Sequence, residues 1–179
     1  MGDYKTVRSL SSVALRLAAS RHTPFHFDYY TMDTGDDPTA FSGKLIEAQS
    51  EYLGLAITKI LSLYVSHPSP PNSVLIVAHS MGGMVPLNLL AISEEHRPKI
   101  NTLILLSTPV LLPVFSPGSY MDEIYLRVHD MLIHRARGQE PSLSNIALIS
   151  VTGGTRDLQD SVFQIINAGL KDIIDIEFF

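Results

Sequence analysis

The sequence contains no cysteine, few charged residues and no long uninterrupted apolar run. The absence of cysteine from all 179 residues excludes disulfide bonds, thiolate metal ligands and a cysteine nucleophile. Charged residues make up 17% of the chain, and 13 basic against 18 acidic residues give a net charge of −5. A weakly acidic chain has little electrostatic attraction for nucleic-acid phosphates or anionic lipid. Apolar residues still account for 45% of the chain, as in a packed globular protein.

No segment has the pattern of a signal peptide or of a membrane-spanning helix. The first residues, Met1–Lys5, carry charge and are not followed by an apolar stretch, so no signal peptide is expected. The most apolar stretch, Leu103–Val114, contains Pro109 and Pro113 and is shorter than the ~20 apolar residues that span a bilayer. Histidine is unevenly distributed, because all seven lie at or before His134 and the last 45 residues contain none.

The alternation of apolar patterns predicts an α/β fold. Continuous apolar runs rich in β-branched residues are typical of strands buried on both faces of a parallel sheet. The predicted strands are 73–78, 100–106 and 146–151, with a short aromatic strand at 25–30, and the predicted helices are 7–17, 44–64, 82–92 and 120–136. Tyr52 and Leu55 are expected on the buried side of the long helix. The fold class is therefore α/β, with a mainly parallel sheet and helices on both faces.

The segment Ala78–Gly83, between a predicted strand and a predicted helix, has the pattern of a nucleophile elbow. In such a turn Ser80 adopts a strained conformation that exposes its hydroxyl, and small residues such as Ala78 and Gly82 are expected where the backbone is crowded. The Met81 N–H is then a natural oxyanion donor. His79 is expected to support the elbow from beneath, with Gly83 opening the helix. The alternative is that Ser80 only caps the helix.

A serine nucleophile needs a histidine base and a carboxylate that orients it. In this fold the order along the chain is serine, acid, histidine. Asp157 follows a strand and a Gly-Gly turn, so it is the expected acid; Asp160 is its nearest rival, and a helix cap or an ion pair with Arg156 is the alternative role. No histidine follows Asp157, so we expect the base to lie beyond Phe179 and the chain to be an incomplete hydrolase domain over 1–179.

The pattern resembles the GPI inositol-deacylase family, which comprises membrane-bound α/β-hydrolases of the endoplasmic reticulum. The segments that carry the resemblance are Gly2–Leu10, Asp28–Asp33, Ala40–Gly43, Gln49–Tyr52, Ile60–Tyr64, Ala78–Gly83, Leu106–Pro109 and Ile149–Asp157. Two departures are Ala78, where the family has glycine, and Val110, where histidine is usual. The resemblance implies an α/β-hydrolase fold with Ser80 as the nucleophile and Asp157 as the acid.

The same resemblance implies a function. Family members remove a fatty acyl chain from the inositol of GPI anchors, which assists export of GPI-anchored proteins, and they need no metal or organic cofactor. Membrane contact and location in the endoplasmic reticulum membrane are implied for the parent protein. Tyr120, Met121 and the apolar segment Leu111–Phe115 are candidates for acyl-chain contact, with ordinary packing as the alternative. Two other functions stay open: a generic lipase or esterase, and a non-catalytic fragment or pseudoenzyme.

Overall fold

The computed structural model describes residues 4–21, 27–33, 42–113, 118–152 and 173–177. The chain divides into two compact units, Met1–Asp36 and Asp37–Phe179. The first unit contains the helix α1, Tyr4–Arg21, which confirms and extends the helix predicted over 7–17. Residues 27–30 have no regular secondary structure, so the predicted strand is wrong there. A strand needs a hydrogen-bonded neighbour, and aromatic propensity alone does not supply one.

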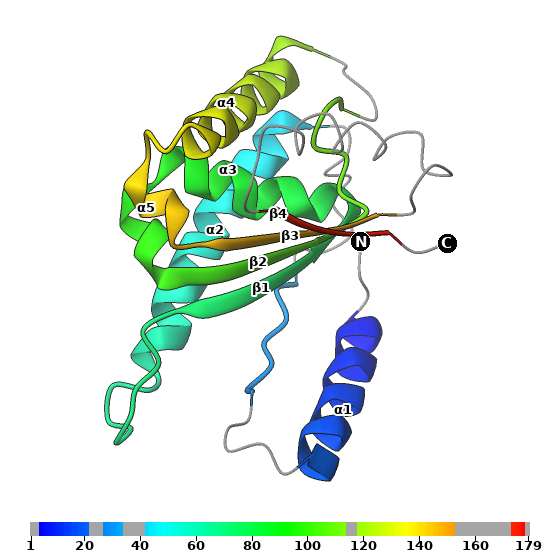
Figure 1. Cartoon of the computed structure of the whole chain (residues 1–179), viewed down its shortest axis with the longest axis vertical. Helices are drawn as coiled ribbons and strands as arrows, with labels where there is room; N and C mark the ends of the chain where they lie inside the picture. Colours follow the sequence, from blue (N-terminus) through cyan, green and yellow to red (C-terminus); the bar gives the residue numbers. More distant parts are fainter. Residues whose placement is uncertain (1–3, 22–26, 34–41, 114–117, 153–172, 178–179) are drawn as a thin grey trace. The chain divides into compact units, whose positions relative to one another are not determined.

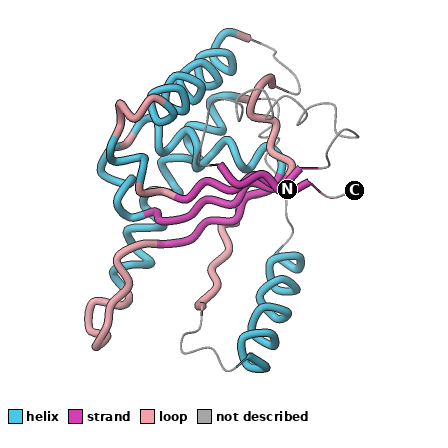
Figure 2. Tube along the Cα trace, viewed as in Figure 1, coloured by secondary structure: helices cyan, strands magenta, loops and turns pink. Residues whose placement is uncertain are grey.

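The second unit alternates strands and helices as the apolar pattern predicts (Figures 1 and 2). The elements are α2 (Gly43–Ser62), β1 (Val74–His79), η2 (Ser80–Gly83), α3 (Met84–Ile92), η3 (Glu94–Lys99), β2 (Ile100–Leu106), α4 (Ser119–Ala136), α5 (Pro141–Ser144), β3 (Ala147–Thr152) and β4 (Ile173–Glu177). The predicted α/β class and the three predicted apolar strands of this unit are therefore confirmed. The strand β4 was not predicted, although its sequence alternates apolar and acidic residues.

The four strands form one parallel sheet in the order β1-β2-β3-β4. Each described strand lies beside its predecessor, and the order does not reverse. Right-handed crossovers between strands that advance in one direction all pass over the same face of a sheet. Figure 1 accordingly shows α3, α4 and α5 on one side of the sheet. The sequence predicted helices on both faces of the sheet. Within the described part of this unit, α3, α4 and α5 lie on one face.

The other face of this sheet is partly exposed at β1. Burial alternates along β1, and the side chains of Leu75 and Val77 are each 43% exposed. Val77 lies beside Ile104, which in turn lies beside Ile149 in the register of the three strands. This face is therefore apolar where the strands pair.

The core lies between the sheet and the helical layer. Every residue of Met84–Leu90 is buried, so α3 is enclosed on all sides rather than amphipathic. The helix α3 packs against both α2 and α4. From the sheet, Leu103, Leu105 and Leu148 complete this core. The helix that follows the Ser80 turn is therefore buried over seven consecutive residues, Met84–Leu90.

The buried face of α2 differs from the one expected from hydrophobicity. Tyr52 and Leu55 are 52% and 71% exposed, whereas Gly43, Ser50 and Gly54 are buried. A Cβ at Gly43 would lie 3.0 Å from the Met121 nitrogen, and one at Gly54 would lie 3.0 Å from the His96 ring. Small residues let this part of the helix approach its neighbours closely, and the apolar side chains of Ile46 and Ile57 are buried together with them.

Polar side chains tie the helices together within the apolar layer. Asn88, which is fully buried on α3, donates to the Ser50 hydroxyl of α2 at 3.1 Å and accepts from Arg127 of α4 at 3.3 Å. The Ser50 hydroxyl in turn lies 2.9 Å from the carbonyl oxygen of Val85. A buried amide costs free energy unless it is paired, so this network fixes the mutual register of the three helices.

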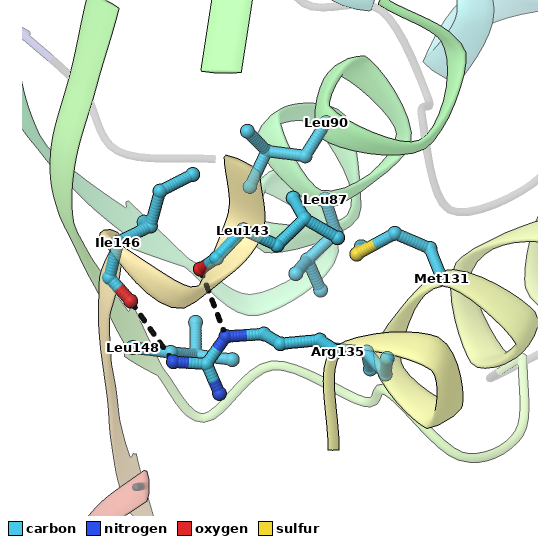
Figure 3. Close-up of a pocket in the computed structure, with 8 residues that line it drawn as sticks. Leu87, Leu90, Met131, Arg135, Leu143, Ile146 and Leu148 are labelled. Carbon is cyan, nitrogen blue, oxygen red and sulfur yellow. Dashed lines mark hydrogen bonds between the residues drawn. The ribbon is translucent and has the colours of Figure 1, made fainter. Parts of the chain in front are cut away.

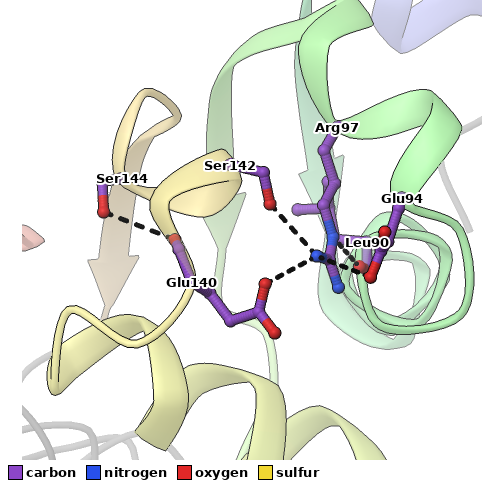
Figure 4. A network of polar contacts seen from close by, with 6 residues as sticks. All are labelled: Leu90, Glu94, Arg97, Glu140, Ser142 and Ser144. Carbon is purple, nitrogen blue, oxygen red and sulfur yellow. Dashed lines mark hydrogen bonds and ion pairs between the residues drawn. The ribbon is translucent and has the colours of Figure 1, made fainter.

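Two arginines join the ends of these helices to α5. Arg97 is 5% exposed; it donates to the Leu90 carbonyl and pairs with Glu140 at 2.9 Å (Figure 4). Arg135 donates to the carbonyls of Leu143 and Ile146, at 3.3 and 2.9 Å, beside an apolar cavity of about 10 Å³ (Figure 3). These hydrogen bonds hold the helical layer in place at the edge of the sheet where β3 begins.

Candidate functional site

Ser80 lies at the carboxyl end of β1, where the chain turns sharply into a helix. Its backbone φ is +53°, in the left-handed region that residues other than glycine rarely adopt. The N-cap of the following helical turn is His79, with extended φ and ψ and no capping side-chain hydrogen bond. The strained backbone of Ser80 is typical of an elbow serine, and its role as a nucleophile rather than a helix cap stays a prediction. A strained serine at a strand-to-helix turn is the geometry of a nucleophile elbow.

The residues after Ser80 form one helical turn that leads into α3. The first N–H groups of a helix have no partner within it, so the expected role of the Met81 N–H as an oxyanion donor stays a prediction. The Met81 side chain is 6% exposed and packs inward, with its sulfur 3.7 Å from the Tyr125 hydroxyl oxygen. Buried anchoring of this side chain fixes the direction of the adjacent backbone.

The elbow is crowded at Gly83 rather than at Gly82, where a small residue was expected for steric reasons. A Cβ at Gly82 would meet no described atom within 4 Å, so the steric reason given for a small residue there is wrong within the described structure. A Cβ at Gly83 would lie 2.5 Å from Cγ2 and 2.8 Å from Cβ of Thr108 and would overlap its hydroxyl. Gly83 is thus the position where the elbow touches the neighbouring strand end.

That neighbouring strand end contains a second left-handed serine, which sequence reasoning missed. Ser107 directly follows β2 and has a φ of +45°. His79 pairs with Leu106 in the parallel register, so Ser80 and Ser107 are the next residues on adjacent strands. The Ser107 N–H donates to the Val151 carbonyl at 2.8 Å. No glycine motif marks this turn, so the sequence carried no signal for it.

The remaining elbow residues lie as follows. Ala78, which stands where the family pattern has glycine, is half-buried on β1. His79 is exposed, and its ring forms no hydrogen bond within the described residues. Its expected supporting role therefore stays a prediction. Leu112, one of the candidates for acyl-chain contact, is 73% exposed in the segment after β2, whereas Met121 is 2% exposed and belongs to the core.

The expected acid lies outside the described residues, as do Asp160 and Gly153. The strand β3 that precedes it ends at Thr152, at the same edge of the sheet as Ser80 and Ser107. The carboxyl ends of parallel strands are where ligand sites form in open α/β sheets. The strand that precedes Asp157 thus ends at the edge of the sheet where Ser80 lies, and the role of Asp157 as the acid stays a prediction.

Four of the five described histidines have partners away from Ser80, and the fifth is His79, which precedes Ser80 in the chain. His129 donates from Nε2 to the Val110 carbonyl at 2.7 Å, and His134 lies 3.5 Å from Asp130. His96 lies 2.7 Å from the Ser93 hydroxyl, and His67 bonds within its own turn to Ser69. Among the residues that the structure describes, no histidine is hydrogen-bonded to the Ser80 hydroxyl.

Among the residues that the structure describes, no group of three or more metal-ligating side chains comes together. In the same residues, no helix combines the length and apolar character that crossing a bilayer requires.

The chain matches the family described as "PGAP1-like alpha/beta domain" over residues 1–172. It is 35% identical to the GPI inositol-deacylase of Rattus norvegicus and 36% identical to that of Xenopus laevis, over 158 residues in each case. It is also 36% identical over 169 residues to GPI inositol-deacylase A of Yarrowia lipolytica. Each match covers 88% of this chain but only 16 or 17% of the relative. The chain therefore belongs to the PGAP1-like alpha/beta domain family.

Proposed function

We propose that this chain carries the nucleophile of a serine acyl-ester hydrolase of the GPI inositol-deacylase type. The observation that supports the proposal is the left-handed serine, Ser80, at the strand-to-helix turn. In a protein whose relatives are named GPI inositol-deacylase, such a serine is the expected acyl acceptor. The substrate of the whole protein would be the acylated inositol of a GPI anchor, met at the endoplasmic reticulum membrane.

The proposed reaction begins with attack of the Ser80 hydroxyl oxygen on the acyl carbonyl carbon. The proton of that hydroxyl passes to a histidine base as the bond forms, and the carbonyl oxygen becomes an oxyanion. The Met81 N–H donates to that oxyanion, and Asp157 orients the histidine. The inositol oxygen then leaves with the proton, and water releases the fatty acid from Ser80. Exposed Leu112 supplies apolar contact for the acyl chain.

A non-catalytic role is the second candidate, and a specific observation favours it. Four of the five described histidines, His67, His96, His129 and His134, hold other partners, and none of the five is hydrogen-bonded to the Ser80 hydroxyl. General-base assistance contributes about 10²–10⁴-fold to such reactions. We therefore expect the chain alone to react slowly with a fluorophosphonate, a probe that modifies activated serines.

Chemical rescue separates the two candidates. Free imidazole supplies a base without altering the protein, so it should accelerate fluorophosphonate labelling of the wild-type chain if the elbow is formed. Ser80→Ala should abolish the accelerated labelling, whereas Ser62→Ala, at an exposed serine of α2, should leave it unchanged. Labelling is located by mass spectrometry of the intact chain and its peptides. Absence of labelling at Ser80 both with and without imidazole would refute the proposed nucleophile.

Two further outcomes refine the function. Rapid labelling of Ser80 without imidazole would show that this chain supplies its own base. Hydrolysis of simple acyl esters, but not of an acylated inositol lipid, in the imidazole-supplemented reaction would favour the generic lipase or esterase.

A further inference from the structure

Two side chains of α4, one helical turn apart, form hydrogen bonds to the Pro109–Val110 turn that follows β2. We call this pair of contacts the grip of α4 on that turn. The Tyr125 hydroxyl donates to the Pro109 carbonyl at 2.8 Å, and His129 Nε2 donates to the Val110 carbonyl at 2.7 Å. The two rings meet edge to face, with centroids 6.1 Å apart. Tyr125 is 3% exposed and Val110 is 1% exposed, so these hydrogen bonds are shielded from water.

The gripped turn touches the elbow at two places. Thr108, which is 3% exposed, fills the space over Gly83 so completely that no Cβ fits there. The Tyr125 hydroxyl has one proton, which the Pro109 carbonyl accepts, and its oxygen also packs against the Met81 sulfur at 3.7 Å. Tyr125 therefore contacts the elbow directly, whereas His129 acts on it only through Val110 and Thr108.

Both turns contain strain that must be held by their surroundings. Left-handed backbone is strained at a residue other than glycine. Such conformations persist only where neighbouring contacts determine them. Ser80 and Ser107 are both in this region, on adjacent strands. The contacts that bracket them are the Ser107 N–H to Val151 bond on one side and the grip of α4 on the other.

We propose that Tyr125 and His129 are positioning residues of the Ser80 site. From α4 they hold the Pro109–Val110 turn, and through Thr108 they press that turn against Gly83, which fixes the elbow. The inference rests on the proposed function for its effect on reactivity, but its structural part stands on the contacts alone. Val110 takes part through its carbonyl, so the apolar side chain at this position leaves the grip intact.

His129→Leu is the decisive variant because His129 does not touch the elbow. It removes the donor to Val110 with little change in volume, and His129→Gln restores an N–H donor at a similar distance from the backbone. Arg135→Leu is the matched control: Arg135 also donates from α4 to backbone carbonyls, those of Leu143 and Ile146, but beside Met131 rather than beside Met81 (Figure 3). Tyr125→Phe tests the direct contact.

Two readouts are measured on the full chain. The first is the NMR signals of the Met81 methyl group and of the Gly83 amide, with the Met131 methyl as internal reference. The second is the rate of imidazole-supported fluorophosphonate labelling at Ser80. We expect His129→Leu to move the Met81 and Gly83 signals and to slow labelling by on the order of tenfold, because small misplacements of reacting groups have effects of this size. His129→Gln should recover both readouts.

Each outcome decides the proposal. Arg135→Leu should lower the melting temperature and move the Met131 signal while leaving Met81 and the labelling rate unchanged. If His129→Leu behaves like Arg135→Leu, with a lower melting temperature and an unchanged elbow, the positioning role is refuted. If Ser80 is never labelled in any variant, the proposed hydrolase function fails. The Met81 and Gly83 signals still decide whether α4 fixes the elbow.

Discussion

Gly83→Ala is the substitution for which the structure predicts the sharpest cost. Two atoms of Thr108 lie 2.5 and 2.8 Å from the position that the new methyl group would occupy. Carbon atoms in contact prefer about 3.5–4.0 Å, so the two chain segments must separate by roughly 1 Å. Overpacking of this kind costs about 1–3 kcal/mol, and buried Thr108 lacks room to turn away, which favours the upper half. Alanine has a higher helix propensity than glycine, which offsets up to about 1 kcal/mol of this cost. A net loss of about 1–2 kcal/mol in unfolding free energy follows.

The chain offers a control at the adjacent residue. Gly82 is exposed, its φ lies outside the left-handed region, and a Cβ there meets no described atom within 4 Å. Gly82→Ala should therefore stabilise the chain by about 0.4–1 kcal/mol, because alanine restricts the unfolded state. Thr108→Ala removes two of the three crowding atoms, so in that background Gly83→Ala should cost less than it does alone.

Thermal unfolding followed by circular dichroism measures both effects. For a chain of this length each kcal/mol shifts the melting temperature by about 2–4 °C, so Gly83→Ala should melt about 2–8 °C lower. Gly82→Ala should melt at the same temperature as wild type or slightly higher. Equal melting temperatures for the two glycine variants would contradict the close approach of the elbow and the turn after β2. So would a Gly83→Ala cost that Thr108→Ala does not reduce.

Three further predictions use the same chain. Ser80→Gly should exceed Ser80→Ala in urea-unfolding free energy by roughly 0.5–1 kcal/mol, because only glycine adopts a φ of +53° without strain; an alanine variant at least as stable would refute it. Burial raises the pKa of Tyr125 above its ordinary value near 10, so its contribution to stability is complete below pH ~10 and is lost as pH rises further; urea midpoints should fall more steeply in wild type than in Tyr125→Phe. Arg97→Met, which leaves Glu140 without its partner, should cost about 2 kcal/mol, and a loss no greater than that of Lys99→Met at an exposed pair would contradict this.

The sequence predicted the elements of the second unit well where periodicity and burial agree. The apolar run Ile100–Leu106 has the bounds of β2, and the elbow segment lies where β1 gives way to a helix. Prediction was wrong about which residues of α2 are buried. Ile46 and Ile57 are buried there together with Gly43, Ser50 and Gly54, whose small size admits Met121, a Val85 carbonyl and the His96 ring. No apolar periodicity reports which neighbour a helix will approach.

The candidate site was predictable only in its local part. Ser80, Met81 and the glycines belong to one short segment with a recognisable pattern, so local sequence located the turn. Ser107 and Tyr125 contribute through contacts between segments far apart in the chain, such as the Tyr125 hydroxyl on the Pro109 carbonyl. Sequence gives the residue types at such contacts but not their distances. The steric demand at Gly83 was missed for the same reason, because its cause is Thr108 in the turn after β2.

The sheet topology explains why two strained serines lie side by side. The strands follow one another in one direction across the sheet. After β1 and after β2 the chain must therefore turn toward the same face of the sheet before it enters its crossover. Ser80 and Ser107 follow paired residues in the parallel register, and both turn at the same height. The segments that follow these two serines are Met81–Gly83 and Thr108–Val110. They enter the same space above the strand ends, where Gly83 and Thr108 are in contact. Glycine at 83 is thus required by the neighbouring turn rather than by the elbow alone, and a change in either turn must be felt by the other.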